Sequence, residues 1–123
     1  MTKTLPVLIV EDDPDLREAL NDTLALSRYR VLTAVDGVHA VEMLQKHAVG
    51  LVISDVQMPN MNGFELTKTI KSRPNLSHLP VVLVTSLGSD EDIAQGLAVG
   101  ADAHIVKKEL TRGELMKTIN QLL

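Results

Sequence analysis

Five side chains suited to chemistry each stand directly after a short apolar segment of this 123-residue sequence. Glu11 and Asp12 follow the first such segment, and Asp55 follows the third. Thr85 follows the fourth and Lys107 the fifth. Together these groups form a set for phosphoryl transfer, with carboxylates to hold a metal ion, a carboxylate nucleophile, and two groups that bind phosphoryl oxygens.

Each of these residues by itself has an ordinary structural explanation. An acid after a strand as a rule has no chemical role, threonine is common in turns, and lysine is mostly solvated. Asp13, beside the acidic pair, is typical of a helix N-cap. The joint placement of acids, hydroxyl and lysine at the ends of four segments is what favours the chemical interpretation.

Crowded carboxylates predict a cation among them. If the first and third apolar segments are neighbouring strands, their ends lie about 4.8 Å apart. Two full charges at ~4 Å repel by roughly 4 kcal/mol at an effective dielectric constant of about 20. Oxygen ligands that leave room for retained water suit Mg²⁺. We therefore expect Mg²⁺ at Glu11, Asp12 and Asp55.

The apolar segments alternate with five longer amphipathic stretches, which predicts a doubly wound α/β fold with helices on both faces of a parallel sheet. With right-handed crossovers the simplest order of the five strands is 2-1-3-4-5, as in flavodoxin-like folds. The first, third and fourth strands are apolar at successive positions and should be central. The predicted strands are Val7–Val10, Val31–Val35, Leu51–Ser54, Val81–Val84 and Ala103–Val106.

Helix starts are marked by capping residues. Asp13-Pro14 predicts the first helix, and the second should run from about Val38 to His47. The third and fifth should open with capping boxes, Asn62 with Glu65 and Thr111 with Glu114, and the third should end before Pro74. The fourth should follow Ser89. The expected inward residues are Leu16, Ala19, Leu20, Thr23 and Leu24; Val38, Val41 and Leu44; Ile93, Ala94, Leu97 and Ala98; and Leu115, Ile119 and Leu122.

Composition excludes several classes of function. Acids outnumber bases by 16 to 12, which argues against a nucleic-acid partner. One Tyr, one Phe and no Trp leave little for stacking on a base or flavin, and the lack of Cys excludes thiol chemistry. Since no apolar stretch approaches ~18 residues, we expect no membrane span and a cytoplasmic protein. We expect a single domain over residues 1–123, with no output domain.

Four stretches resemble the receiver domains of two-component response regulators of the CheY type, over essentially the whole chain. These are Val10-Glu-Asp-Asp-Pro-Asp-Leu-Arg17, Asp55-Val-Gln-Met-Pro-Asn-Met-Asn-Gly63, Val84-Thr-Ser86 and Gly100-Ala-Asp-Ala-His-Ile-Val-Lys107. The resemblance implies a phosphoprotein of a phosphorelay rather than an enzyme. It implies that Asp55 accepts a phosphoryl group from a histidine kinase or histidine phosphotransfer protein.

The same resemblance implies the other roles at the site. Glu11, Asp12, Asp55 and the backbone carbonyl of Gln57 would hold Mg²⁺. Thr85 would bind a phosphoryl oxygen and move with it, and Lys107 would pair with the aspartyl phosphate. Movement of Thr85 would shift the fourth helix and fifth strand and so change a protein-binding face, completed by the fifth helix, on a monomer or weak dimer.

Two positions depart from the family pattern. Lys108 stands where the family usually has proline, which leaves the local backbone open. His104 stands where the family usually has Tyr or Phe as the switch residue. His104 is either a half-buried residue of an edge strand or a switch ring that also responds to pH.

Three other functions and one other setting are alternatives to this interpretation. A haloacid-dehalogenase-type phosphatase would want a second Asp where Gln57 stands. A flavin carrier would want a phosphate-binding loop where Glu11-Asp-Asp-Pro14 stands. A pseudo-receiver that binds partners without phosphorylation does not need the complete set of site residues found here. A receiver module from a chemotaxis-type hybrid histidine kinase remains an alternative setting for the same chemistry.

Overall fold

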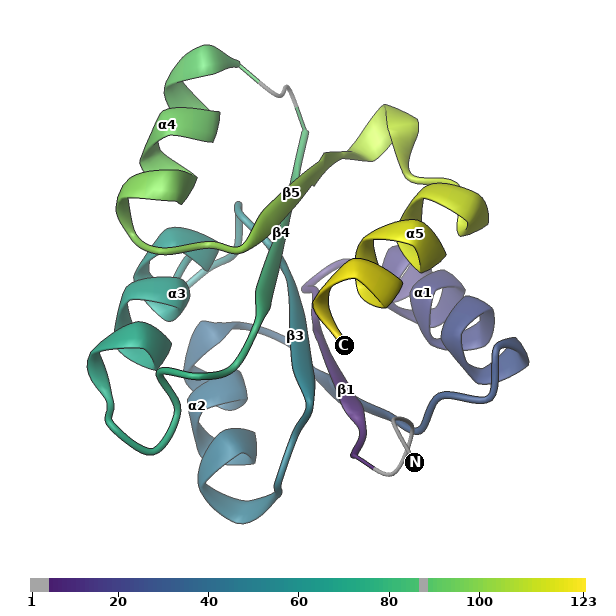
Figure 1. The fold of residues 1–123 in the computed structure, drawn as a ribbon, viewed down its shortest axis with the longest axis horizontal. Coiled ribbons are helices and arrows are strands. Elements are labelled where there is room, and N and C mark those ends of the chain that lie inside the picture. The colour runs from purple at the N-terminus through teal and green to yellow at the C-terminus, as the bar shows by residue number, and fades with distance from the viewer. Residues whose placement is uncertain (1–4, 87–88) are drawn as a thin grey trace.

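The computed structural model describes residues 5–86 and 89–123 of the chain. Its sheet has five parallel strands in the order β2-β1-β3-β4-β5, which confirms the predicted topology (Figure 1). The register sets Val10 beside Ser54 and Asp55 beside Val84, so the carboxyl ends of β1, β3 and β4 meet at one edge. The strands are β1 (Val7–Val10), β2 (Val31–Ala34), β3 (Leu51–Asp55), β4 (Val81–Thr85) and β5 (Ala103–Val106).

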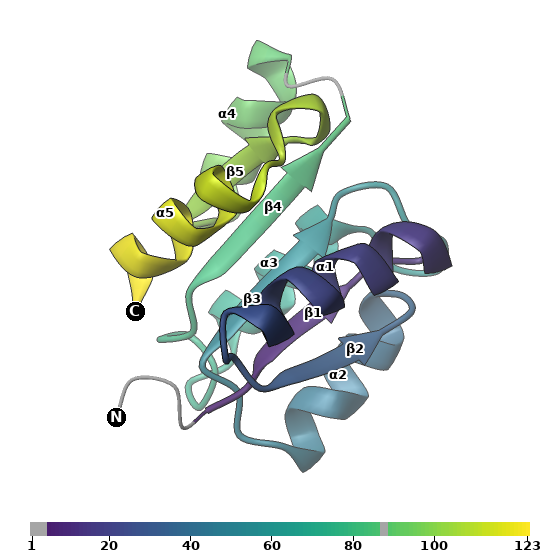
Figure 2. The same ribbon diagram turned by 90° about the vertical axis from the view of Figure 1, so that its right-hand side faces the viewer.

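Helices cover both faces of this sheet. Figures 1 and 2 show α1 and α5 on one face and α2, α3 and α4 on the other. A 3-10 turn, η1, joins β5 to α5. The helical elements are α1 (Pro14–Leu26), α2 (Gly37–Lys46), α3 (Gly63–Ser72), α4 (Asp90–Ala98), η1 (Lys107–Glu109) and α5 (Arg112–Leu122).

Two aliphatic cores lie on the two sides of the sheet, because every residue of β1, β3 and β4 is buried. On one side Leu8, Val52 and Leu83 pack with residues of α2 and α3. On the other side Ile53 and Val84 pack with residues of α1 and α5. The edge strands β2 and β5 are only partly buried, as their polar residues predicted. A sheet covered on both faces holds the strand ends rigidly.

The predicted caps form, with one difference. The Asp13 side chain accepts from the Asp15 N–H at 3.0 Å, and Pro14 opens α1. Asn62 and Glu65 cap each other's backbone N–H groups at 2.8 and 3.0 Å.

At α5 the Thr111 side chain accepts from the Glu114 N–H at 3.1 Å. The backbone N–H of Thr111 donates to the carbonyl of Glu109 at 2.9 Å, so the predicted reciprocal bond to the Glu114 side chain is wrong. The 3-10 turn before α5 brings the Glu109 carbonyl to this N–H first.

The predicted inward face of α4 is largely wrong. Ala94, Leu97 and Ala98 are exposed, Leu97 to 63%, and Ile93 is half-buried. Gly96 is the buried residue of this helix. A Cβ at Gly96 would lie 3.3 Å from Leu83 Cδ1 and 3.8 Å from Phe64 Cε1. The backbone of α4 therefore approaches the core closely at Gly96, where a side chain would be tight, and the small apolar residues on either side face solvent.

Two other inward assignments are also wrong. Val38 in α2 is 44% exposed, and Ala19 in α1 is exposed. In α2 the buried residues are Gly37, Ala40 and Leu44, because the helix packs against Met61 through Gly37, which turns the next residue, Val38, outward. The remaining inward residues of α1 and α5 are buried or half-buried as predicted.

Gly63 is required where α3 begins, directly against the end of β3. Its N–H donates to the Val56 carbonyl at 2.8 Å, and an added Cβ would lie 2.9 Å from Val56 Cα. We predict that Gly63→Ala lowers the free energy of unfolding by about 1–3 kcal/mol in urea titrations, since backbone has to move. Gly113→Ala is the control, because its Cβ would lie 4.0 Å from Thr111 Oγ1, an ordinary van der Waals contact. Equal stability of the two variants would contradict the close approach.

Candidate functional site

Three carboxylates converge where β1 and β3 end. Glu11, Asp12 and Asp55 each offer an oxygen, and these oxygens lie within 4.8 Å of one another. Glu11 is 1% exposed and Asp55 4%, whereas Asp12 is exposed. The Glu11 N–H donates to the Ala34 carbonyl at 3.0 Å, which extends the strand pairing up to this residue. Sheet register therefore sets the spacing of the acids.

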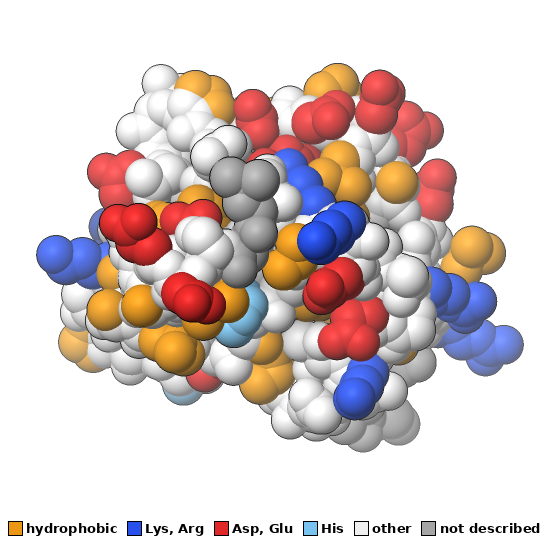
Figure 3. Space-filling model, turned by 90° about the horizontal axis from the view of Figure 1, so that it is seen from above, with side chains coloured by type: hydrophobic (Ala, Val, Ile, Leu, Met, Phe, Trp, Pro, Cys, Tyr) orange, Lys and Arg blue, Asp and Glu red, His pale blue; other side chains and the backbone are white. Residues whose placement is uncertain are grey.

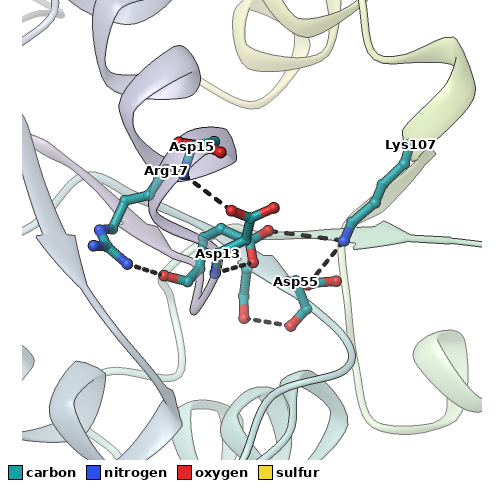
Figure 4. A network of polar contacts seen from close by, with 7 residues as sticks. Asp13, Asp15, Arg17, Asp55 and Lys107 are labelled. Atoms are coloured by element: carbon teal, nitrogen blue, oxygen red, sulfur yellow. Dashed lines mark hydrogen bonds and ion pairs between the residues drawn. The ribbon is translucent and has the colours of Figure 1, made fainter.

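Lys107 supplies a positive charge to this cluster from the end of β5. Its Nζ lies 3.0 Å from Asp55 Oδ2 and 4.0 Å from Glu11 Oε1 (Figure 4). Burial by itself lowers the pKa of Lys107, but the hydrogen bond and charge of Asp55, with the charges of Glu11 and Asp12, hold that pKa above its ordinary value. Lys107 thus stays cationic beside the acids.

Glu11 is held in place by its own neighbours. Its Oε2 accepts from the Asp13 N–H at 3.1 Å, and Arg17 Nη1 donates to its backbone carbonyl at 2.8 Å (Figure 4). Burial raises the pKa of Glu11 to about 7; the Asp13 N–H opposes the shift, and the charge of Asp55 adds to it. The charge of Lys107 also opposes the shift, and a second cation beside Glu11 would favour its charged form further.

Two buried oxygens, Asp55 Oδ1 and Thr85 Oγ1, have no hydrogen-bond partner among the described residues. Both belong to the last residues of neighbouring strands, β3 and β4. A buried polar atom without a partner costs about 1–3 kcal/mol, so native proteins rarely keep one without a use. A cation would satisfy Asp55 Oδ1, and the oxygen of an anionic group would accept from the Thr85 hydroxyl.

A cleft of about 590 Å³ opens beside the acids. It lies between the segment after β3 and the first turns of α4. Figure 3, which looks onto the carboxyl end of the sheet, shows acidic side chains gathered around a few basic ones. The cleft is lined by Asp12, Val56, Gln57, Met58, Pro59, Asn62, Phe64, Asp92 and Gln95.

Comparison with known proteins decides the family. The family model described as "Response regulator receiver domain" matches residues 7–120. The chain belongs to the response regulator receiver family. It is a receiver domain of two-component signalling, and its acidic pocket of Glu11, Asp12 and Asp55 fits Mg²⁺ and a phosphoacceptor. Receiver domains interact with a histidine kinase or a phosphotransfer protein.

Individual relatives agree. The chain is 38% identical to the gliding motility regulatory protein of Myxococcus xanthus over 120 residues. This match covers 98% of the chain and 15% of the Myxococcus protein. The chain is 42% identical over 101 residues, 82% of its length, to the response regulator protein FleR of Pseudomonas aeruginosa, of which the match covers 21%. The receiver thus spans less than a quarter of either relative.

Solved structures give the same family. The receiver domain of a signal transduction histidine kinase from Syntrophus aciditrophicus has 35% identity and a TM-score of 0.90, covering 98% of this chain and 90% of that one. Chemotaxis protein CheY4 of Vibrio cholerae also has 35% identity and a TM-score of 0.90, covering 97% and 98%. In the part of the receiver that the structure describes, no helix is both long and apolar enough to cross a membrane.

The structure brings together most of the residues predicted for the site. Glu11, Asp12, Asp55 and Lys107 form one cluster. Thr85 ends the neighbouring strand, and Gln57 lines the cleft. Asp92 and Gln95, which also line the cleft, were missed by sequence reasoning. Asp92 could have been identified from the sequence, because it lies in the first turn of the helix that follows the fourth strand, at the same edge of the sheet as the acids.

His104 and Lys108 are the two departures from the family pattern. Neither has a positive φ angle or a cis peptide bond. His104 is exposed on β5, so its interpretation as half-buried is wrong. Its neighbour Ile105 packs on the α1–α5 side, which places position 104 on the less covered face. Lys108 lies in the 3-10 turn η1, and every peptide bond of the described residues is trans.

Stability of the metal-free receiver should depend on pH through Glu11. Between its ordinary pKa of 4.5 and its folded pKa of about 7, the folded protein binds more protons than the unfolded chain. The contribution of Glu11 to the free energy of unfolding is therefore present below pH 4.5 and lost as pH rises to about 7. We expect a loss on the order of 1–3 kcal/mol, seen by urea unfolding in EDTA.

Glu11→Gln should remove this part of the pH dependence, and exposed Glu18→Gln on α1 should retain it. A profile of Glu11→Gln that parallels the wild type would show that burial of Glu11 is not its cause.

Proposed function

We propose that Asp55 is the phosphoacceptor of this receiver and takes its phosphoryl group from a histidine kinase or a histidine phosphotransfer protein. A carboxylate oxygen of Asp55 would bond to phosphorus as the phosphorus–nitrogen bond of the donor phosphohistidine breaks, and that electron pair would return to the imidazole. One observation carries the proposal: Lys107 holds Asp55 Oδ2 at 3.0 Å, while the buried Oδ1 has no partner among the described residues.

Glu11, Asp12, Asp55 and the backbone carbonyl of Gln57 would hold Mg²⁺. Their support is the oxygen donor set within 4.8 Å and the placement of Gln57 in the lining of the same cleft. Bound Mg²⁺ supplies positive charge that offsets the developing charge on phosphoryl oxygens. Lys107 adds a second positive charge, since its raised pKa keeps it protonated. Thr85 would donate its hydroxyl hydrogen to a phosphoryl oxygen.

Thr85 would also start the response to phosphorylation. The hydroxyl has no partner among the described residues, so a phosphoryl oxygen would draw it toward Asp55. Thr85 leads into the connection to α4, and α4 packs through Gly96 with Leu97 turned to solvent. The proposed readout is a change in the face formed by α4, β5 and α5, with His104 exposed on it. A downstream protein would bind this face.

The setting of the receiver has two candidates. It is a single-domain regulator over residues 1–123, monomeric or weakly dimeric, in the cytoplasm, or it is the receiver module of a hybrid histidine kinase. The comparisons support both equally, since the chain is 35% identical to the receiver of the Syntrophus histidine kinase and 35% identical to chemotaxis protein CheY4. The chemistry at Asp55 is the same in both, and in neither is the domain a turnover enzyme.

The central test is phosphorylation in solution. Incubation with Mg²⁺ and acetyl phosphate should add one phosphoryl mass by intact-protein mass spectrometry, and Asp55→Asn should lose it. Asp22→Asn is the matched control, because Asp22 is exposed on α1. Removal of Mg²⁺ with EDTA should slow labelling at least about tenfold. Equal labelling of Asp55→Asn and wild type would exclude Asp55 as the acceptor.

Thr85→Ala should separate phosphorylation from its readout. With beryllofluoride as a phosphoryl mimic, we expect changes in amide hydrogen exchange to concentrate in residues 85–108 and around Asp55. The alanine variant should still be labelled by acetyl phosphate but show smaller changes beyond residue 90, because the moving hydroxyl is gone. Responses in α1 and α2 as large as those in α4 would place the readout elsewhere.

A further inference from the structure

The segment that follows Asp55 is held at its tip by the start of α2. Asn60 Nδ2 donates to Asp36 Oδ2 at 2.8 Å, across 24 residues of sequence. The other oxygen of the Asp36 carboxylate, Oδ1, accepts from the His39 N–H at 2.8 Å and so caps α2. One carboxylate thus joins a helix start to the loop that carries Gln57.

Backbone contact reinforces this junction. The Gly37 N–H donates to the Met61 carbonyl at 3.3 Å. A Cβ at Gly37 would lie 2.7 Å from that carbonyl oxygen and from Met61 Cβ, so the two loops meet where no side chain fits. At its base the same loop is closed by the bond from the Gly63 N–H to the Val56 carbonyl at 2.8 Å.

The tethered residue has an unusual backbone. Asn60 has a φ of 69°, in the left-handed region that glycine and asparagine tolerate. The Met61 N–H donates to the Pro59 carbonyl at 2.7 Å, which tightens the turn around it. The side chain of Asn60 is exposed, so the contact with Asp36, rather than burial, holds it.

We propose that Asp36 and Asn60 are positioning residues that hold the loop so that the Gln57 carbonyl is preset for Mg²⁺. Gln57 lies three residues before Asn60, between the closed base and the tethered tip. The inference rests on the proposed function of the site. A preset loop does not have to be ordered when the ion binds, so the tether strengthens binding without touching the metal.

The charge of Asp36 supports a firm tether. Hydrogen bonds from the His39 N–H and then from the Asn60 side chain lower the pKa of Asp36, so the carboxylate stays charged at neutral pH. Charge-assisted hydrogen bonds are shorter and stronger than neutral ones.

Asn60→Gly tests the tether while it keeps a residue that accepts the left-handed backbone. We expect the dissociation constant for Mg²⁺, measured by isothermal titration on the whole chain, to rise about fivefold to tenfold. Asn75→Gly is the matched control, because Asn75 is exposed in the connection from α3 to β4. It should bind Mg²⁺ within about twofold of the wild type.

A charge-neutral exchange tests the pair itself. N60D alone sets two carboxylates against each other and should weaken Mg²⁺ binding, whereas D36N with N60D restores a donor and an acceptor. The double variant should return to within about twofold of the wild type. The tether is refuted by wild-type affinity in Asn60→Gly, by equal weakening in Asn75→Gly, or by failure of the double variant to recover. Failure of the wild type itself to bind Mg²⁺ would refute the proposed function instead.

Discussion

Repulsion among three carboxylates is the constraint on which this receiver depends. Glu11, Asp12 and Asp55 offer oxygens within 4.8 Å of one another, and two of these side chains are buried. At such distances each pair costs roughly 3–4 kcal/mol when both members are charged and the effective dielectric constant is about 20. The metal-free fold reduces this cost in two ways: Lys107 lies between Asp55 and Glu11, and the pKa of Glu11 rises to about 7.

Parallel topology is what makes this crowding possible. Strands β1, β3 and β4 are buried on both faces, and their pairing fixes where each one ends. Gly63 lets α3 start against the end of β3, and the cleft opens beside this turn, lined by Asp12, Val56 and Gln57. The aliphatic sheet therefore holds the carboxylates close together despite their repulsion, and the loop after β3, held at its base and tip, borders the cleft.

Much of the fold and site could be predicted because the signals are local. Buried strands appear as continuous apolar runs, and helix caps are single residues such as Asp13 and Asn62. The site residues stand at the ends of strands, and the order of those strands follows from the right-handedness of the crossovers. The orientation of α4 could not be predicted, since a core contact through Gly96 leaves no apolar side chain to count. The hydrogen bond between Asp36 and Asn60 could not be predicted for another reason. It joins two loops 24 residues apart, and the sequence of neither loop indicates that the two are in contact.

The contact of α4 through Gly96 also has a consequence for whatever reads this surface. Helices with interlocked side chains settle in discrete positions, whereas a contact through glycine offers less resistance to a shift of the helix, which suits α4 to the movement proposed for it. Linkage is reciprocal: if phosphorylation of Asp55 shifts α4 as proposed, a partner that prefers the shifted helix would favour the phosphorylated state by the same factor. The amount of bound partner would then set, in part, how much phosphate the domain holds, so the protein that detects the signal would also influence its level.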